Sequence, residues 1–139
     1  MRNIINLSLC LCLLLGSCKA QKSNISFSSL NGNWEIVELN GASLTDKKPT
    51  LTFNVSDKKV SAYAGCNRLA GTVTPDTKSP ASLKIGTVIS TKMFCANAMD
   101  TEHTLAKALE AVETFDTVKE SCIFYGANKQ KLFVIKKIK

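Results

Sequence analysis

The sequence is poor in the residue types from which catalytic sites are usually built. Its 139 residues include one histidine, His103. A Ser-His-Asp or Cys-His arrangement would have to use His103, and no nucleophile elbow or comparable signature accompanies it. The acidic residues are spread singly, and neither a Walker loop nor a dinucleotide glycine fingerprint occurs. We therefore expect no enzymatic activity and no cofactor.

A metal site is equally poorly supported. Cys66, Cys95 and His103 offer two sulfurs and an imidazole, but the two cysteines lack the close paired spacing of zinc sites. His103 also falls one position from Glu102 in a predicted helix, where a surface location is the more common one. The sequence thus predicts no bound metal.

The chain lacks a concentrated basic segment, although it is basic as a whole. Its formal net charge is +7. The lysines occur in ones and twos, and no nucleic-acid motif or ladder of aromatic residues accompanies them. This pattern indicates a solvated surface beside a membrane, and we expect no nucleic-acid partner.

The longest apolar run is too short to span a bilayer. It covers residues 4–15 with two polar interruptions, whereas a spanning helix needs about 20 apolar residues. With Arg2 ahead of it, this run is typical of a secretory signal. The segment 15–18, Leu-Gly-Ser-Cys, resembles a bacterial lipobox, in which the cysteine is acylated and the chain is cut before it. The alternative is an ordinary cleaved signal in which Cys18 is incidental.

Acylation at this position would divide the chain into three parts. Residues 1–17 are then the lipoprotein signal peptide, 18–29 a lipidated flexible tether and 30–139 the folded domain. Removal of the signal leaves 139 − 17 = 122 residues, a length typical of one domain. Two or three acyl chains suffice for stable attachment, so the membrane is an expected partner through Cys18. Lys19 does not resemble the aspartate that retains lipoproteins in the inner membrane, and we expect an outer-membrane anchor facing the periplasm of the bacterial cell envelope.

The domain has the pattern of an antiparallel α+β fold. Alternation and turn residues predict strands over 34–39, 51–55, 60–64, 71–74, 82–85, 87–93, 117–126 and 132–135, the last two forming a hairpin. The alternation slips between Ile36 and Val37, which indicates a bulge. The parity of the third strand continues to Cys66 and predicts that its thiol is buried. An apolar stripe at helical spacing predicts one helix over 98–113, with Asn97 as its cap.

Several short motifs follow one another in this domain. They are Gly32-Asn33-Trp34, Gly65-Cys66-Asn67 with Gly71, Thr91-Lys92-Met93 with Cys95, and then Glu102, Leu109 and the C-terminal hairpin. This order resembles the META domain family over nearly all of residues 30–138. The resemblance implies a curved antiparallel β-sheet, or half-barrel, packed around one main α-helix. It also associates the chain with the bacterial envelope and with stress responses such as heat shock. Lys92 stands where many members carry arginine, which would matter only if a planar fork were needed there.

The resemblance further implies a disulfide between Cys66 and Cys95. An exported chain enters an oxidising compartment, where disulfides persist. This bridge would close a loop of roughly 30 residues and stabilise the fold by about 3.5 kcal/mol in the chain-entropy model. Cys122 would then remain as a small buried hydrophobe. The residues themselves leave the pairs Cys66–Cys122 and Cys95–Cys122 open.

Two hypotheses of function follow. In the first, the chain is a non-enzymatic envelope lipoprotein that supports envelope integrity or the stress response through contacts with an unidentified envelope protein. In the second, it is a carrier or chaperone that binds a lipid or other apolar ligand in the half-barrel groove. The interior distinguishes them, because a carrier needs an apolar cavity of roughly several hundred Å³. A contact module would instead be filled by its large residues, Trp34, Phe53, Phe124 and Phe133.

Overall fold

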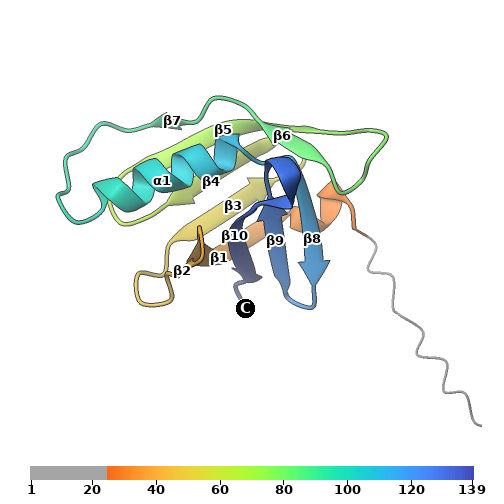
Figure 1. Cartoon of the computed structure of the whole chain (residues 1–139). Helices are drawn as coiled ribbons and strands as arrows, with labels where there is room; N and C mark the ends of the chain where they lie inside the picture. The colour runs from red at the N-terminus through yellow and green to blue at the C-terminus, as the bar shows by residue number, and fades with distance from the viewer. Residues whose placement is uncertain (1–24) are drawn as a thin grey trace, which may run out of the picture.

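The computed structural model describes residues 25–139, which form strands, one α-helix and two short 3₁₀ helices (Figure 1). The strands are β1 (Gly32–Leu39), β2 (Ala42–Ser43), β3 (Thr50–Asn54), β4 (Lys59–Tyr63), β5 (Arg68–Pro75), β6 (Leu83–Ile85), β7 (Ile89–Ser90), β8 (Thr114–Val118), β9 (Ser121–Tyr125) and β10 (Lys131–Lys137). The helices are η1 (Phe27–Leu30), α1 (Met99–Glu110) and η2 (Ala127–Lys129).

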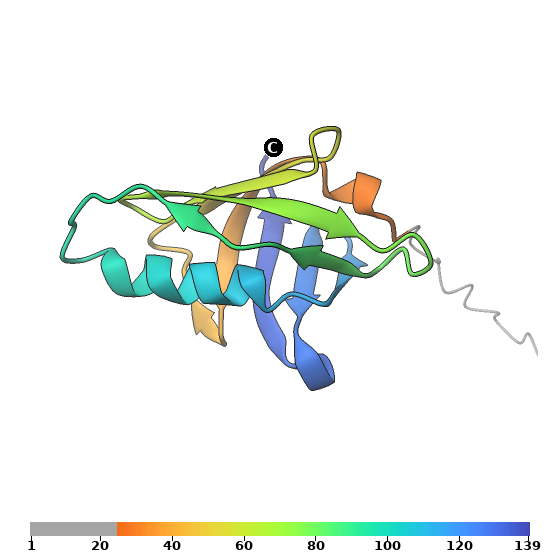
Figure 2. The same ribbon diagram turned by 90° about the horizontal axis from the view of Figure 1, so that it is seen from above.

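The strands form one curved antiparallel sheet. Its order is β6-β5-β4-β3-β1-β10-β9-β8, with β2 paired to β1 and β7 paired to β5. Two backbone hydrogen bonds connect the ends of the sheet. The Leu83 amide donates to the Glu113 carbonyl (3.1 Å), and the Phe115 amide donates to the Ala81 carbonyl (2.8 Å). Helix α1 packs inside the curve (Figures 1 and 2). The expected half-barrel around one main helix is confirmed.

Four phenylalanines fill the interior of the half-barrel. Alternation along β3, β8, β9 and β10 turns Phe53, Phe115, Phe124 and Phe133 inward, and all four are fully buried. The ring of Phe124 stacks on those of Phe133, Phe115 and Phe53, with centroids 4.6, 5.8 and 5.9 Å away. Trp34 is buried as well, as the sequence predicted. The inside of the sheet is therefore a packed core.

The start of β1 and the end of β10 lie side by side. Strand β1 pairs with β10, and beyond the pairing the Ile138 amide donates to the Asn33 carbonyl (3.3 Å). The indole of Trp34 donates to the Leu30 carbonyl (2.7 Å), which fastens η1 beneath it. The Lys137 ammonium lies 4.4 Å from the centre of the Trp34 ring. Ile25 and Phe27 also pack against the core, so the packed unit includes residues that precede Leu30.

The predicted signal peptide, residues 1–17, and the lipidation site Cys18 lie outside the described residues. Within residues 25–139, no helix has both the length and the apolar character needed to cross a bilayer.

The helix is shorter than the predicted 98–113. It begins at Met99 with Ala98 in the capping position and no side-chain hydrogen bond there, so the prediction of Asn97 as the cap is wrong. At the other end, the Glu113 amide donates to the Tyr125 carbonyl (2.9 Å). The chain thus joins the sheet at Glu113, and the helix ends at Glu110, before the apolar stripe does.

Two predicted strands differ from the structure. Residues 117–126 are not one strand, because β8 and β9 form a hairpin whose turn contains Lys119 at φ +56°. Glycine or asparagine usually supplies this left-handed geometry, so the sequence carried no turn signal. Of the predicted strand 87–93, only β7 is regular. The predicted bulge is confirmed by a register shift between Ile36 and Glu38, and the β9–β10 hairpin is confirmed too.

Replacing Phe124 tests whether the phenylalanine cluster carries the stability of the domain. Phe124→Ala should lower the free energy of unfolding by about 3–5 kcal/mol, because it leaves a cavity among three stacked rings. Phe94→Ala is the matched control, since Phe94 is exposed and should change stability by less than about 0.5 kcal/mol. Urea denaturation measures both. Equal effects of the two substitutions would contradict a packed interior.

Candidate functional site

The segment from Thr87 to Ala98, here called the strap, connects the sheet to α1. It pairs with β5 only at β7, where Ser90 lies opposite Leu69, and the last backbone bond runs from the Thr91 amide to the Arg68 carbonyl (3.2 Å). Beyond Thr91 the strap leaves the sheet, but side-chain hydrogen bonds and a disulfide still attach it to the chain that precedes β5.

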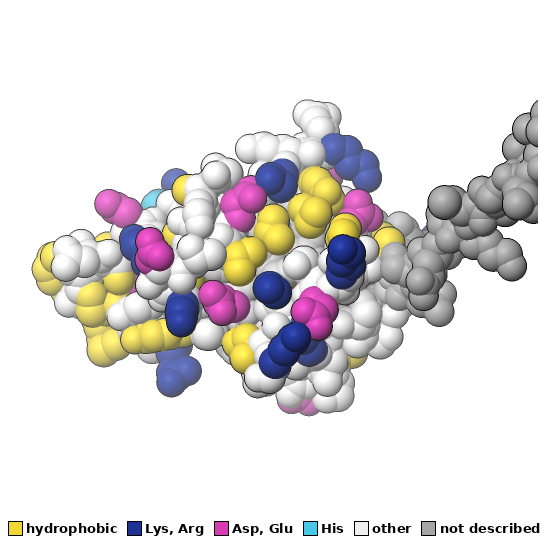
Figure 3. All heavy atoms as spheres, turned by 90° about the horizontal axis from the view of Figure 1, so that it is seen from below, with side chains coloured by type: hydrophobic (Ala, Val, Ile, Leu, Met, Phe, Trp, Pro, Cys, Tyr) yellow, Lys and Arg dark blue, Asp and Glu magenta, His cyan; other side chains and the backbone are white. Residues whose placement is uncertain are grey.

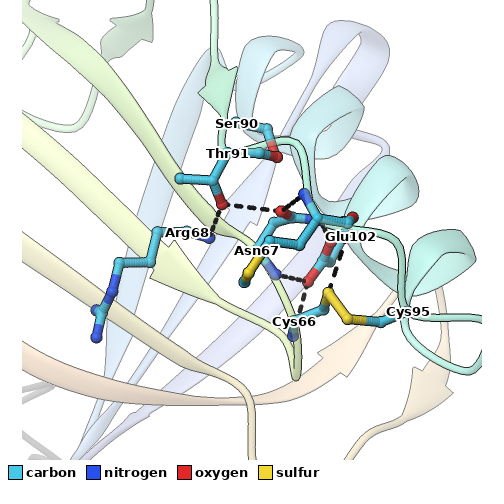
Figure 4. Close-up of a disulfide and its surroundings, with 8 residues drawn as sticks. Cys66, Asn67, Arg68, Ser90, Thr91, Cys95 and Glu102 are labelled. Atoms are coloured by element: carbon cyan, nitrogen blue, oxygen red, sulfur yellow. Dashed lines mark hydrogen bonds between the residues drawn. A yellow bond between two sulfur atoms is a disulfide. The ribbon is translucent and has the colours of Figure 1, made fainter.

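The side chain of Asn67 replaces the missing strand partner of the strap. Its Oδ1 accepts from the Met93 amide (2.8 Å) and from the Thr91 hydroxyl (2.8 Å). Its Nδ2 donates to the Met93 carbonyl (3.0 Å). Asn67 is only 3% exposed, and it binds both the donor and the acceptor of one peptide residue, as a neighbouring strand would (Figure 4).

Glu102 of α1 holds Asn67 in place. One carboxylate oxygen accepts from the backbone amides of Cys66 (2.9 Å) and Asn67, and the other accepts from Asn67 Nδ2 (2.8 Å). Glu102 is 5% exposed. A buried carboxylate is costly unless it is fully hydrogen-bonded, and three N–H donors supply those bonds here, at the N-terminal turn of a helix.

This role of Glu102 was missed from the sequence. From the sequence, Asp100 and Glu102 are two acidic residues in the first turn of a helix, where negative charge is favourable to the helix dipole. The spacing held a further signal, because Glu102 lies three residues before Leu105 and seven before Leu109, both buried. A glutamate in line with a buried apolar stripe points toward the core.

The predicted disulfide is confirmed and forms the second fastening. Cys66 and Cys95 are bonded, with Cα atoms 6.0 Å apart and a sequence separation of 29. Cys66 is buried, as its strand parity predicted. Their sulfurs are bonded to each other, and His103 is exposed on α1, so the three residues weighed as metal ligands form no common cluster of free donors.

Local geometry accounts for the glycines at motif positions 65 and 71. Gly65 has φ of +116°, a conformation that side chains rarely adopt, and it turns the chain so that the next two amides face Glu102. A Cβ at Gly71 would lie 3.1 Å from Ile85 Cγ2, a tight contact that the Ile85 side chain would have to relieve by shifting.

The side chain of Arg68, next to the motif, points away from the network (Figure 4), and its guanidinium lies 5.9 Å from the centre of the Tyr63 ring. Two motif residues are also placed differently. Lys92 is exposed on the strap. Trp34 lies on β1, near the middle of the strand order, and takes no part in holding the strap.

The outer side of the strap carries apolar side chains near α1. Phe94 is 85% exposed and Met93 55%, and Met99 at the start of α1 is exposed as well. An open groove of about 600 Å³ lies between the strap and α1. Its apolar lining comes from Leu69, Val88, Met93, Phe94, Met99 and Ala106, and Lys92 and His103 also line it. The strap thus exposes apolar side chains, while the Asn67 hydrogen bonds and the disulfide on its inner side fix its backbone.

These features define a class of protein, a small α+β domain whose curved sheet carries a disulfide-fastened strap against one helix. The chain belongs to the META domain family, whose family model matches residues 23–138. No curated protein matches the chain.

Solved structures under 25% identical share the fold. A DUF4847 family protein from Bacteroides vulgatus is 14% identical, with a TM-score of 0.58 over 77% of this chain and 92% of that one. A protein from Burkholderia xenovorans, solved by NMR, is 18% identical, with a TM-score of 0.60 over 81% of this chain and 86% of that one. Another NMR structure is 22% identical with a TM-score of 0.58, covering 77% of this chain and 89% of that one.

Glu102→Gln should release the strap. The new amide keeps one acceptor but places an NH₂ against Asn67 Nδ2, so a donor faces a donor. We expect a loss of about 1–3 kcal/mol in the free energy of unfolding and faster hydrogen exchange at the Met93 amide. His103→Gln, one position along the same helix and exposed, should leave both unchanged. A Glu102→Gln protein that matches this control would show that the carboxylate is dispensable.

Cys122 is a free, buried thiol on β9. Burial raises its pKa from the usual 9.0 to about 11, against a smaller lowering by Lys137. The folded state therefore favours the neutral thiol. Its contribution to stability is complete below about pH 9 and is lost as the pH rises toward about 11.

Iodoacetamide should consequently label Cys122 far more slowly in the folded protein than in urea, because the thiolate is the reactive form. A chain of residues 18–139 with Cys18→Ser leaves Cys122 as the one free thiol, and mass spectrometry measures its alkylation. Equal rates in the folded and unfolded chains would contradict the burial and the raised pKa.

Proposed function

We propose that this META domain protein is a non-enzymatic lipoprotein of the bacterial envelope. It is anchored through Cys18, and it supports envelope integrity or the stress response through contacts with other proteins. The lipobox-like segment 15–18 supports the anchor. The protein-contact role is supported by the packed interior and by the exposed strap.

The observation that carries the choice between a contact protein and a carrier is the phenylalanine cluster. A carrier in the half-barrel would need an apolar cavity inside the sheet. That space is occupied by Phe53, Phe115, Phe124 and Phe133, each fully buried. The most exposed of the large apolar side chains, Phe94 at 85%, lies outside the half-barrel on the strap, where a partner can reach it.

Mass spectrometry of the full-length product, expressed in a bacterial host and extracted from its membranes, tests this proposal. The denatured chain should begin at residue 18 and carry acyl chains on Cys18, with a further loss of two mass units for the disulfide. The native mass should equal the denatured mass, because no ligand is held in the filled interior.

Cys18→Ser is the matched control and should remove the acyl mass without changing the disulfide. An unacylated Cys18 would refute the anchor. A small apolar molecule that accompanies the native protein and departs on denaturation would favour the carrier instead.

A further inference from the structure

We propose that the groove between the strap and α1 binds monovalent copper. The ligands are the thioether sulfurs of Met93 and Met99 and the imidazole of His103. This inference goes beyond the proposed function and depends neither on the lipid anchor nor on a protein partner. The sequence predicted no metal site from Cys66, Cys95 and His103, and the structure places His103 in one groove with two methionines instead.

The first argument is where the soft ligands of the chain lie. Beyond Met1, the methionines of the chain are Met93 and Met99, and its one histidine is His103. All three line the same groove of about 600 Å³. Met93 is 55% exposed and Met99 39%, so neither thioether fills the core, where methionine is often found. The chain therefore exposes these two methionines and its histidine at one place.

The second argument is that the fold brings the strap ligand to the two helix ligands. Met99 and His103 are four positions apart on α1, so their side chains lie on the same face of the helix. Asn67 Nδ2 donates both to the Met93 carbonyl (3.0 Å) and to the Glu102 carboxylate (2.8 Å). The backbone of Met93 is thus fixed one side chain away from the first turns of α1. Methionine has three rotatable bonds, which allow its sulfur to adjust to a metal ion.

The third argument is the choice of metal that the donors make. Thioether sulfur is a soft ligand that selects Cu(I), and imidazole also binds copper. Calcium and magnesium need free oxygen ligands, but the carboxylate that lines the groove, Glu102, already accepts three N–H donors. Within residues 25–139, no three His, Cys, Asp or Glu side chains are grouped to hold a metal ion, so a conventional zinc site is not formed there.

The charges that line the groove do not select an ion by themselves. Lys92 and Glu102 carry opposite charges, and both line the groove. The affinity for Cu(I) therefore comes from the two sulfurs and the imidazole rather than from the electrostatic field.

The position of the groove makes the ligands accessible to an ion in solution. The loop between β7 and α1 lies at one end of the molecule, and the chain enters the fold through η1 at the other (Figures 1 and 2). Hydrophobic side chains, a class that includes methionine, gather at the end away from the entering chain in the space-filling view (Figure 3). In an anchored protein this end is directed away from the lipid attachment.

Competition for Cu(I) tests the assignment. A chain of residues 18–139 with Cys18→Ser is titrated under nitrogen, with ascorbate, against the coloured Cu(I) complex of bicinchoninate. It should withdraw one copper ion per chain. Met93→Leu and Met99→Leu keep the size and apolar character of the side chain, and each should weaken Cu(I) binding about tenfold or more, as should His103→Gln.

Lys92→Gln is the matched control. Lys92 lines the same groove but offers no ligand at neutral pH, so its substitution should change Cu(I) affinity less than about twofold. Urea denaturation of every variant checks that the fold is kept.

Silver(I) provides a direct view of the ligands, because it is a soft monovalent ion that suits NMR. With methionine labelled with ¹³C at its methyl group, the signals of Met93 and Met99 should both shift on addition of Ag(I). Zn²⁺ should leave both signals in place, since thioethers are poor ligands for it.

Three results would overturn the assignment. They are failure to withdraw copper from bicinchoninate, undiminished binding by the double variant Met93→Leu/Met99→Leu, and methyl signals that Ag(I) leaves unshifted. Undiminished binding would point to the free thiol of Cys122 as the ligand. The test of the anchor is made without added copper and measures the acyl mass, so this proposal and the proposed function fail separately.

Discussion

The geometry of the strap depends on one buried carboxylate. Glu102 faces two backbone amides that have no strand partner, because the chain has just turned at Gly65. The same turn carries the sulfur of Cys66 and the side chain of Asn67, which are the two attachments of the strap. One acceptor group on α1 therefore positions the disulfide and the asparagine together, and it links the helix, the sheet and the strap in one network.

The domain divides its polar and apolar groups in two opposite ways. Inside the sheet, alternation places aromatic rings together and leaves polar side chains in water, as in most small domains. At the strap the order is reversed, because polar groups lie beneath it and Met93 and Phe94 lie outside. The core thus accounts for the stability of the fold, while the hydrogen bonds under the strap fix the shape of an exposed surface. Polar networks that are fully satisfied are suited to this purpose, since their geometry is directional.

The fold was predictable where a residue's own side chain determines its environment. Alternation identified most strands and the inward direction of Cys66, and the motif order identified the half-barrel. Two kinds of feature were not predictable. The β8–β9 turn places Lys119 in a left-handed conformation without glycine or asparagine. Within the strap, the backbone of Met93 is held by Asn67, a side chain more than twenty positions away, and no local pattern encodes such a distant partner. The pairing of Cys66 with Cys95 came from the family resemblance, because spacing alone allowed other pairs.

The adjacency of Asn33 and Ile138 affects how this domain can be combined with others. A unit whose ends lie side by side can be inserted into a surface loop of another protein without separating the strands of either one. It can equally be repeated along a chain, with each copy keeping its own β1–β10 pairing. The two ends of β1 and β10 also support each other, so a fusion at either end extends the chain from a hydrogen-bonded position. The architecture is therefore suited to use as a module.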